Sequence, residues 1–159
     1  MILLFCKKSN FEKEIKMDNQ FREKLTAITK DFFRLFEEKD FDQWILFWAE
    51  DGINRNPYAT GMISEEIVGK EEIYNHFVSA AERFDTIKFS IHEIIVEEEK
   101  RTVVVRLDGK LTIKNGGIYE NTYIFLLHFD KNNKIRECFE YFNPYIAGKA
   151  FGLLDKLKI

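Results

Sequence analysis

A carboxylic acid lies among aromatic residues in the stretch from Arg136 to Tyr145, which we predict to be a strand. Side chains of a strand alternate between two faces, so Glu140 shares a face with Phe142. Both faces carry aromatic side chains, and we expect both to be covered. A carboxyl group in such a setting has a raised pKa, which suits proton transfer near neutral pH. The alternative is an inward acid paired with Arg136 or Arg106.

A second titratable side chain, His76, lies on the apolar side of a predicted helix over residues 70–83. It follows Ile73 by three residues and precedes Ala80 by four, so the three share one face of the helix. A histidine in such a place is commonly a core residue whose ring is satisfied by a backbone carbonyl or an acidic neighbour. The spacing alone therefore leaves its role open.

Aromatic residues make up 15% of the chain, with 16 Phe, which predicts a core or pocket walled by flat apolar surfaces. Trp44 and Trp48 stand at helical spacing and are predicted to be core residues. Hydrogen-bond donors for a ligand carbonyl are available from Tyr58, Tyr119, Asn121 and Tyr123. The alternative for the tyrosines is a place on the surface of the sheet.

Periodicity predicts the elements that position these groups. Apolar residues at spacings of three and four indicate helices over 19–38, 40–48 and 70–83 and a closing helix over 146–157. Residues 50–52 are predicted to be a turn, 53–56 a short strand and 57–68 a loop. From Ile87 the period becomes two, which predicts four long antiparallel strands separated by the turns 97–100, 115–117 and 130–133.

Helices early in the chain and strands later indicate an α+β domain. We expect a cone-shaped barrel, made by a strongly curved antiparallel sheet wrapped on three N-terminal helices, with a pocket inside. Aromatic residues also fall on the outer face of the last strands. This predicts a homodimer in which a second copy covers that face.

Composition limits the class of protein. The chain has 159 residues and a net charge of −3, which gives no support for binding nucleic acid. No apolar stretch approaches the roughly 18 residues of a membrane span, and the first apolar run is too short for a signal peptide. The two cysteines are predicted to be free thiols of a cytoplasmic protein, and no metal-ligand spacing occurs. Residues 1–17 are predicted to be a loosely ordered extension and 18–157 a single domain.

Several short motifs, taken in this order, resemble one known family. The chain is similar to the nuclear transport factor 2-like superfamily and, within it, to the SnoaL-like polyketide cyclase group, closest to the phenazine biosynthesis A/B proteins. The resemblance covers about residues 21–152 and implies a cystatin-like cone. It rests on Ala49-Glu50-Asp51-Gly52, Val68-Gly69-Lys70-Glu71, His76 at the matching offset, Tyr119-Glu120-Asn121, and the last strand from Arg136-Glu137 to Phe142-Asn143-Pro144.

The resemblance also implies roles for particular residues. In the phenazine proteins a histidine on the third helix and a glutamate on the last strand act in acid–base chemistry, and the matching positions are His76 and Glu140. Asp51 and Arg55 stand where the family lines its pocket mouth. In ketosteroid isomerases of the superfamily a tyrosine and two aspartates do the work. Those positions hold Phe32, Asn56 and Phe125, which argues against a steroid isomerase of that type.

These observations support three hypotheses of function. The first is an enzyme without metal or prosthetic group, in which Glu140 and His76 move protons in a cyclisation, condensation or isomerisation of a flat apolar carbonyl metabolite. The second is a non-catalytic module that binds a hydrophobic ligand in the same pocket, with Phe142 among its walls. The third is a protein-interaction domain whose pocket is filled by its own side chains, such as Phe125 and Phe142.

Overall fold

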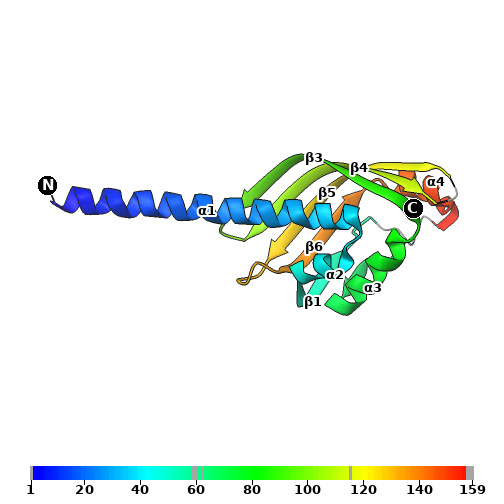
Figure 1. The fold of residues 1–159 in the computed structure, drawn as a ribbon, viewed down its shortest axis with the longest axis horizontal. Coiled ribbons are helices and arrows are strands. Elements are labelled where there is room, and N and C mark those ends of the chain that lie inside the picture. Colours follow the sequence, from blue (N-terminus) through cyan, green and yellow to red (C-terminus); the bar gives the residue numbers. More distant parts are fainter. Residues whose placement is uncertain (1, 59–60, 62, 115, 157–159) are drawn as a thin grey trace.

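Helices from the first half of the chain pack across one face of a curved six-stranded sheet, as Figure 1 shows. The structure is a computed structural model that describes residues 2–58, 61, 63–114 and 116–156, with side chains from residue 19 onward. The helical elements are α1 (Ile2–Glu38), α2 (Phe41–Trp44), η1 (Ile45–Phe47), α3 (Lys70–Ala81), α4 (Pro144–Phe151) and η2 (Leu154–Lys156). The strands are β1 (Trp48–Arg55), β2 (Glu66–Val68), β3 (Phe84–Glu97), β4 (Thr102–Ile113), β5 (Ile118–Phe129) and β6 (Ile135–Phe142).

The strands stand in the order β2-β1-β6-β5-β4-β3. All neighbouring strands are antiparallel except β1 and β6, which run parallel to each other. This pair joins the first strand of the chain to the last. The predicted α+β class and curved sheet are confirmed. The sheet is not closed into a barrel, since β2 and β3 remain as edges. The helices, not further strand pairs, cover the open side.

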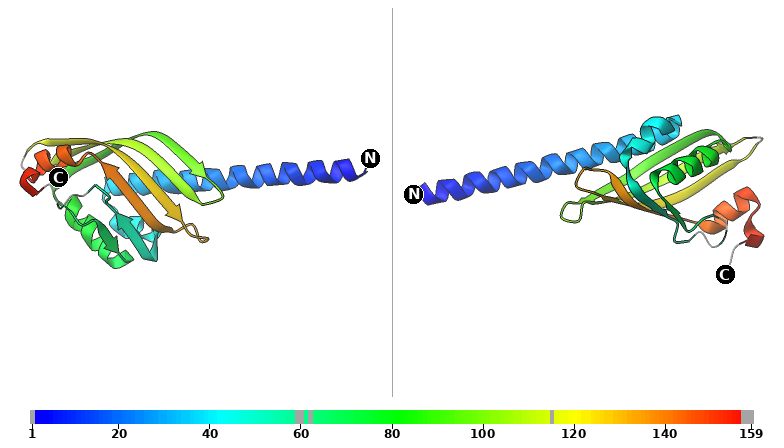
Figure 2. Two further views of the ribbon diagram at one scale, coloured as in Figure 1. Left: turned by 180° about the vertical axis from the view of Figure 1, so that it is seen from behind. Right: turned by 90° about the horizontal axis from the view of Figure 1, so that it is seen from below.

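The first helix is longer than predicted. It begins at Ile2 instead of about Asn19, and its N-terminal half extends past the sheet (Figures 1 and 2). No glycine or proline interrupts residues 2–38, and Asp and Asn inside a helix cost only about 0.7 kcal/mol each relative to alanine. The backbone from Ile2 onward therefore continues α1. The division into an extension over 1–17 and a domain over 18–157 stays a prediction.

The greatest local difference from prediction lies at β1. The predicted second helix ends at Trp44, and the predicted turn over 50–52 lies inside β1. Gly52 supplies close packing here, because a Cβ atom at this position would lie 2.9 Å from Cε3 of Trp48. The register with β6 shifts between Trp48 and Ile53, so the residues predicted to turn lie at an irregularity within the strand. Asp40 caps the start of α2, since its side chain accepts a hydrogen bond from the backbone N–H of Gln43.

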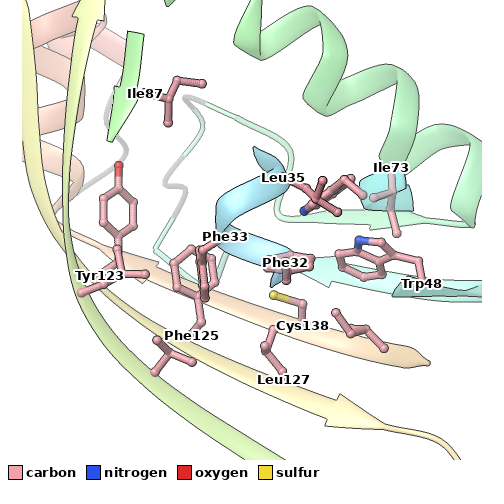
Figure 3. Packing of buried hydrophobic residues seen from close by; sticks show 14 of the residues in the cluster. Phe32, Phe33, Leu35, Trp48, Ile73, Ile87, Tyr123, Phe125, Leu127 and Cys138 are labelled. Atoms are coloured by element: carbon pink, nitrogen blue, oxygen red, sulfur yellow. The ribbon is translucent and has the colours of Figure 1, made fainter. Parts of the chain in front are cut away.

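Aromatic rings from the helices fill the space inside the curve of the sheet. Figure 3 shows Phe33 of α1 against Phe125 of β5, with ring centroids 5.1 Å apart. Trp44 and Trp48 are each 1% exposed, which confirms the prediction that both are core residues. Among the described residues, no helix is long and apolar enough to cross a membrane.

The opposite face of the sheet carries a row of apolar side chains. The strand registers place Ile95, Val104, Leu126 and Phe139 side by side on four consecutive strands. The neighbouring ring of Tyr141 stacks on Phe139 with centroids 6.4 Å apart. A row of this kind suits a symmetric contact with a second copy, and the homodimer remains a prediction.

We expect Phe139→Glu to remain folded and monomeric, because the variant places a charge on this apolar row beside Tyr141. Sedimentation velocity of the wild type and the variant measures the result. Glu120→Gln, a change at an exposed ion pair with Lys110 on the same face, serves as the control. A wild-type protein that sediments as a monomer at all concentrations would disprove the dimer.

Candidate functional site

A cavity of about 570 Å³ lies between the helices and the inner face of the sheet. Such a volume falls in the range of small-molecule sites. Phenylalanine and tryptophan side chains dominate its wall, and the polar groups are few. The polar and charged side chains in the wall include Asn54, Asn56, His76, Arg83, Tyr119, Tyr123, Glu140 and Lys156.

Glu140 lines this cavity from β6, together with Cys138 and Phe142. The alternation predicted from the sequence thus holds, and Phe139 and Tyr141 lie on the other face, stacked on each other. The Glu140 carboxyl forms no hydrogen bond or ion pair with any side chain in the part of the chain that the structure describes. Burial raises the pKa of this carboxyl to about 7.

The alternative interpretation of Glu140 as one half of an internal ion pair does not apply. Arg106 lies 3.8 Å from Glu93 on the outer face of the sheet. Arg136 is exposed at the start of β6. Glu140 is partly exposed, and the part that is exposed faces the cavity. Its carboxyl group lies in apolar surroundings.

His76 lines the same cavity from α3. Its ring packs edge-on against Phe77 with centroids 5.1 Å apart, and its ring nitrogens have no hydrogen-bond partner among the described residues. Burial lowers the pKa of His76, and the positive charge of Arg83 lowers it further. The imidazole is therefore neutral near pH 7 and available to accept a proton. Glu140 and His76, the two groups predicted from the sequence, thus line the same cavity. Their surroundings raise the pKa of the carboxyl and lower the pKa of the imidazole.

The predicted ligand-binding residues divide into two groups. Tyr119, Tyr123 and Phe142 line the cavity. Asn121 is buried at 5% exposure beneath Tyr119 and does not line it, because its amide is used in internal hydrogen bonds. Its predicted role as a ligand contact is therefore replaced by a structural position next to the site.

Asp51, Arg55 and Tyr58 lie outside the cavity wall. The resemblance had implied that Asp51 and Arg55 line the pocket mouth, and Tyr58 was predicted to donate to a ligand. Asp51 is exposed on β1. Arg55 donates to Glu137 at 2.6 Å on the outer face. Tyr58 is 54% exposed and packs on Tyr141, also on that face. Odd-numbered residues at the end of β1 point outward, because the even-numbered residues there point into the cavity.

Sequence reasoning did not assign Asn54 to the site, and it treated Asn56 only as a residue unable to replace a catalytic aspartate. Both asparagines are 1% exposed and line the cavity. Asn54 Nδ2 and Asn56 Oδ1 have no hydrogen-bond partner among the described residues, and the same holds for Nε1 of Trp44 and Trp48. Buried polar groups are seldom left unpaired. The signal in the sequence was two asparagines at alternate positions of a strand.

Comparison with known proteins agrees with this architecture. Residues 29–138, more than half of the chain, match the family model of the SnoaL-like domain. No curated protein sequence is significantly similar to the chain.

Three solved structures illustrate the likeness. BvnE pinacolase from Penicillium brevicompactum is 17% identical with a TM-score of 0.74, covering 85% of this chain and 96% of its own. A phenazine biosynthesis-related protein from Pseudomonas aeruginosa is 19% identical with a TM-score of 0.66, covering 82% and 84%. A nuclear transport factor 2-like protein from Anabaena variabilis is 23% identical with a TM-score of 0.65, covering 76% and 87%. These structures share the fold, and by the match of its residues 29–138 the chain belongs to the SnoaL-like domain family.

Proposed function

We propose that the protein is an acid–base enzyme acting on a flat, largely apolar carbonyl compound, by isomerisation, cyclisation or condensation. The observation that carries the proposal is the unpaired carboxyl of Glu140, whose pKa of about 7 leaves acid and base forms both populated near neutral pH. A general acid–base group works best when its pKa lies near the working pH.

The protons move as follows. The Glu140 carboxylate removes a proton from the carbon next to the carbonyl, and the C–H electron pair moves into the enolate. Glu140 then holds the proton and returns it to the same or another carbon, which restores the carboxylate. His76, neutral at this pH, is the second proton acceptor of the cavity. In a condensation it would take the proton released by the attacking group.

The wall of the cavity supports this class of ligand. Rings from α1, α2 and α3 offer flat apolar surfaces, and Phe142 extends them to β6. Phe125 and Phe142 line the cavity without filling it, which speaks against a pocket closed by the protein's own side chains. BvnE is called a pinacolase, and a SnoaL-like fold that carries catalysis on small molecules is consistent with the proposal.

Exchange of α-protons for deuterium tests the acid–base step without knowledge of the natural substrate. Cyclic and aromatic ketones are incubated with the protein in D₂O and followed by proton NMR. We expect exchange for at least one compound, reduced about a hundredfold in Glu140→Gln, since a positioned general base typically contributes this much. His76→Ala is expected to reduce overall turnover more than exchange.

Glu120→Gln, an exposed carboxylate on the neighbouring strand, is the matched control and should exchange like the wild type. Exchange that is equal in wild type, Glu140→Gln and His76→Ala would refute the mechanism. Tight binding of ketones without any exchange would instead identify a binding module.

A further inference from the structure

We propose that Tyr119 and Tyr123 together form a hydrogen-bond donor for the carbonyl oxygen of the ligand, and that Asn121 is the residue that positions them. The proposal rests on the proposed function for its choice of a carbonyl ligand, and it adds where that oxygen lies. It follows from the hydrogen bonds of three inward-facing residues of β5.

The three side chains lie on one face of β5. Buried residues alternate along this strand, from Tyr119 through Asn121 and Tyr123 to Phe125. Tyr123 and Phe125 project to the same side in Figure 3, and their rings stack with centroids 5.8 Å apart. The two tyrosine hydroxyls meet across the shorter Asn121, at 3.0 Å.

The Asn121 side chain has a fixed orientation. Its Oδ1 accepts from the backbone N–H of Asn143 at 3.1 Å and of Thr122 at 3.0 Å. Its Nδ2 donates to the backbone carbonyl of Asn143 at 2.9 Å and to the Tyr119 hydroxyl at 2.8 Å. Because backbone groups occupy both ends of the amide, the group that faces Tyr119 is a donor. Asn121 therefore has no hydrogen bond left for a ligand.

The tyrosine pair then has one proton to spare. Tyr119 Oη accepts from Asn121 Nδ2 and from Tyr123 Oη. Two phenolic protons are present and one is used between the rings, so the other has no acceptor among the described residues. If the bond between the rings reverses, the spare proton is on Tyr123. In either arrangement one O–H group of the pair is free, and both residues line the cavity.

The neighbouring strand leaves room for this arrangement. Gly109 of β4 stands opposite Asn121, and a Cβ atom there would come within 2.9 Å of Cε2 of Tyr123. Burial also raises the pKa of Tyr119 and of Tyr123, and the charge of Glu140 acts in the same direction. Both hydroxyls thus stay protonated at neutral pH and act as donors, not as bases.

The position of the pair relative to Glu140 matches a carbonyl substrate. In the register of β5 and β6, Tyr123 is opposite Phe142 and Phe125 is opposite Glu140, so Tyr123 and Glu140 are diagonal neighbours on the inner face. A ligand whose oxygen accepts from the tyrosine pair presents its α-carbon toward Glu140. Charge that develops on the oxygen when the proton leaves is then stabilised by the spare O–H group.

The test uses 2-acetylnaphthalene, labelled with ¹³C at the carbonyl, and its match without oxygen, 2-ethylnaphthalene. We expect infrared difference spectra to show the bound carbonyl at a lower frequency than in hexane, because it accepts a hydrogen bond. Tyr119→Phe and Tyr123→Phe should each raise the frequency and weaken binding about three- to tenfold, the effect of one hydrogen bond. Binding of 2-ethylnaphthalene should not change in these variants.

Two further variants test the positioning role of Asn121. Asn121→Leu should also raise the carbonyl frequency, since Tyr119 loses the donor that orients it. If that variant does not fold, Gly109→Ala, which displaces the Tyr123 ring, should have the same spectral effect. Tyr145→Phe, at a tyrosine that is 60% exposed and outside the cavity wall, is the control and should match the wild type.

An unchanged carbonyl frequency in both tyrosine variants would overturn the proposal, and so would failure of 2-acetylnaphthalene to bind. The experiment also separates this proposal from the proposed function. A tyrosine-dependent frequency without any deuterium exchange supports the donor and refutes the enzyme. Deuterium exchange that depends on Glu140, together with a carbonyl frequency that does not depend on the tyrosines, supports the enzyme and refutes the donor.

Discussion

Glu140→Gln is expected to be more stable than the wild type at pH 8, by about 3 kcal/mol, and to have nearly the same stability as the wild type at pH 4. Burial raises the pKa of Glu140 from 4.5 to about 7 in the folded protein. A shift of one unit corresponds to about 1.4 kcal/mol, which gives the size of the effect. Glutamine keeps the shape of the neutral acid and does not ionise.

The direction follows from proton binding. In the unfolded chain the Glu140 carboxyl loses its proton near pH 4.5, whereas in the folded protein it keeps the proton until about pH 7. Between these values the folded state binds more protons, so the free energy of unfolding falls as the pH rises. The wild type therefore loses this stability between about pH 4.5 and pH 7, and the variant does not.

Urea denaturation of wild type and Glu140→Gln at several pH values measures the difference in their free energies of unfolding. Taking the difference cancels the contribution of the other titrating groups, which both proteins share. Glu120→Gln, at an exposed ion pair, is the control and should show a difference of less than about 1 kcal/mol with little dependence on pH. A difference between wild type and Glu140→Gln that stays constant from pH 4 to pH 8 would contradict a raised pKa for Glu140.

The second large effect is expected at Trp44, where alanine should reduce the free energy of unfolding by about 4 kcal/mol. Trp44 is 1% exposed and lies at the centre of the aromatic cluster that forms part of the cavity wall. Its ring contacts five others with centroids 5.1–5.8 Å apart, from α1, α2, β1 and α3: Phe32, Phe36, Phe41, Trp48 and Phe77. Removing the Trp44 ring removes the packing contacts that join α1, β1 and α3 to α2.

Trp44→Phe is the matched comparison and should cost only about 1–2 kcal/mol. It keeps most of the apolar contact, and the Nε1–H group that it removes has no hydrogen-bond partner among the described residues. Urea denaturation at pH 7 compares the two variants. Equal losses for alanine and phenylalanine would show that Nε1, and not ring packing, accounts for the contribution of Trp44.

Local signals in the sequence were sufficient for much of the fold. The third helix was predicted over 70–83 and found as Lys70–Ala81, because its apolar spacing and the acidic residues at its start agree with its tertiary place. The four long strands were found close to their predicted bounds, since each pair is joined by a short turn with its own sequence signal. The bounds of this helix and of these strands are determined by residues that are close together in the chain.

The first strand could not be predicted in the same way. Its partner β6 lies more than 80 residues later, and the register pairs Asn54 with Cys138. Gly52 resembles a turn residue in sequence, yet it serves close packing against Trp48. Asp51 and Arg55 were placed at the pocket mouth by the family resemblance and not by the pattern of the strand. Asn54 lay inside the predicted strand over 53–56, but the local sequence did not show which face of so short a strand meets the cavity.

The sequence by itself determined which side chains share a face. A period of two put Glu140 with Phe142, and a helical period put His76 with Ile73, because both periods are properties of the local backbone. The tertiary structure alone decided what these faces meet. In the folded protein α3 and β6 line one cavity. The Glu140 carboxyl is buried there without a side-chain partner among the described residues, and burial raises its pKa to about 7. Asn121, predicted to contact the ligand, instead donates to Tyr119, because its amide is held by backbone groups of Thr122 in β5 and of Asn143 at the start of α4.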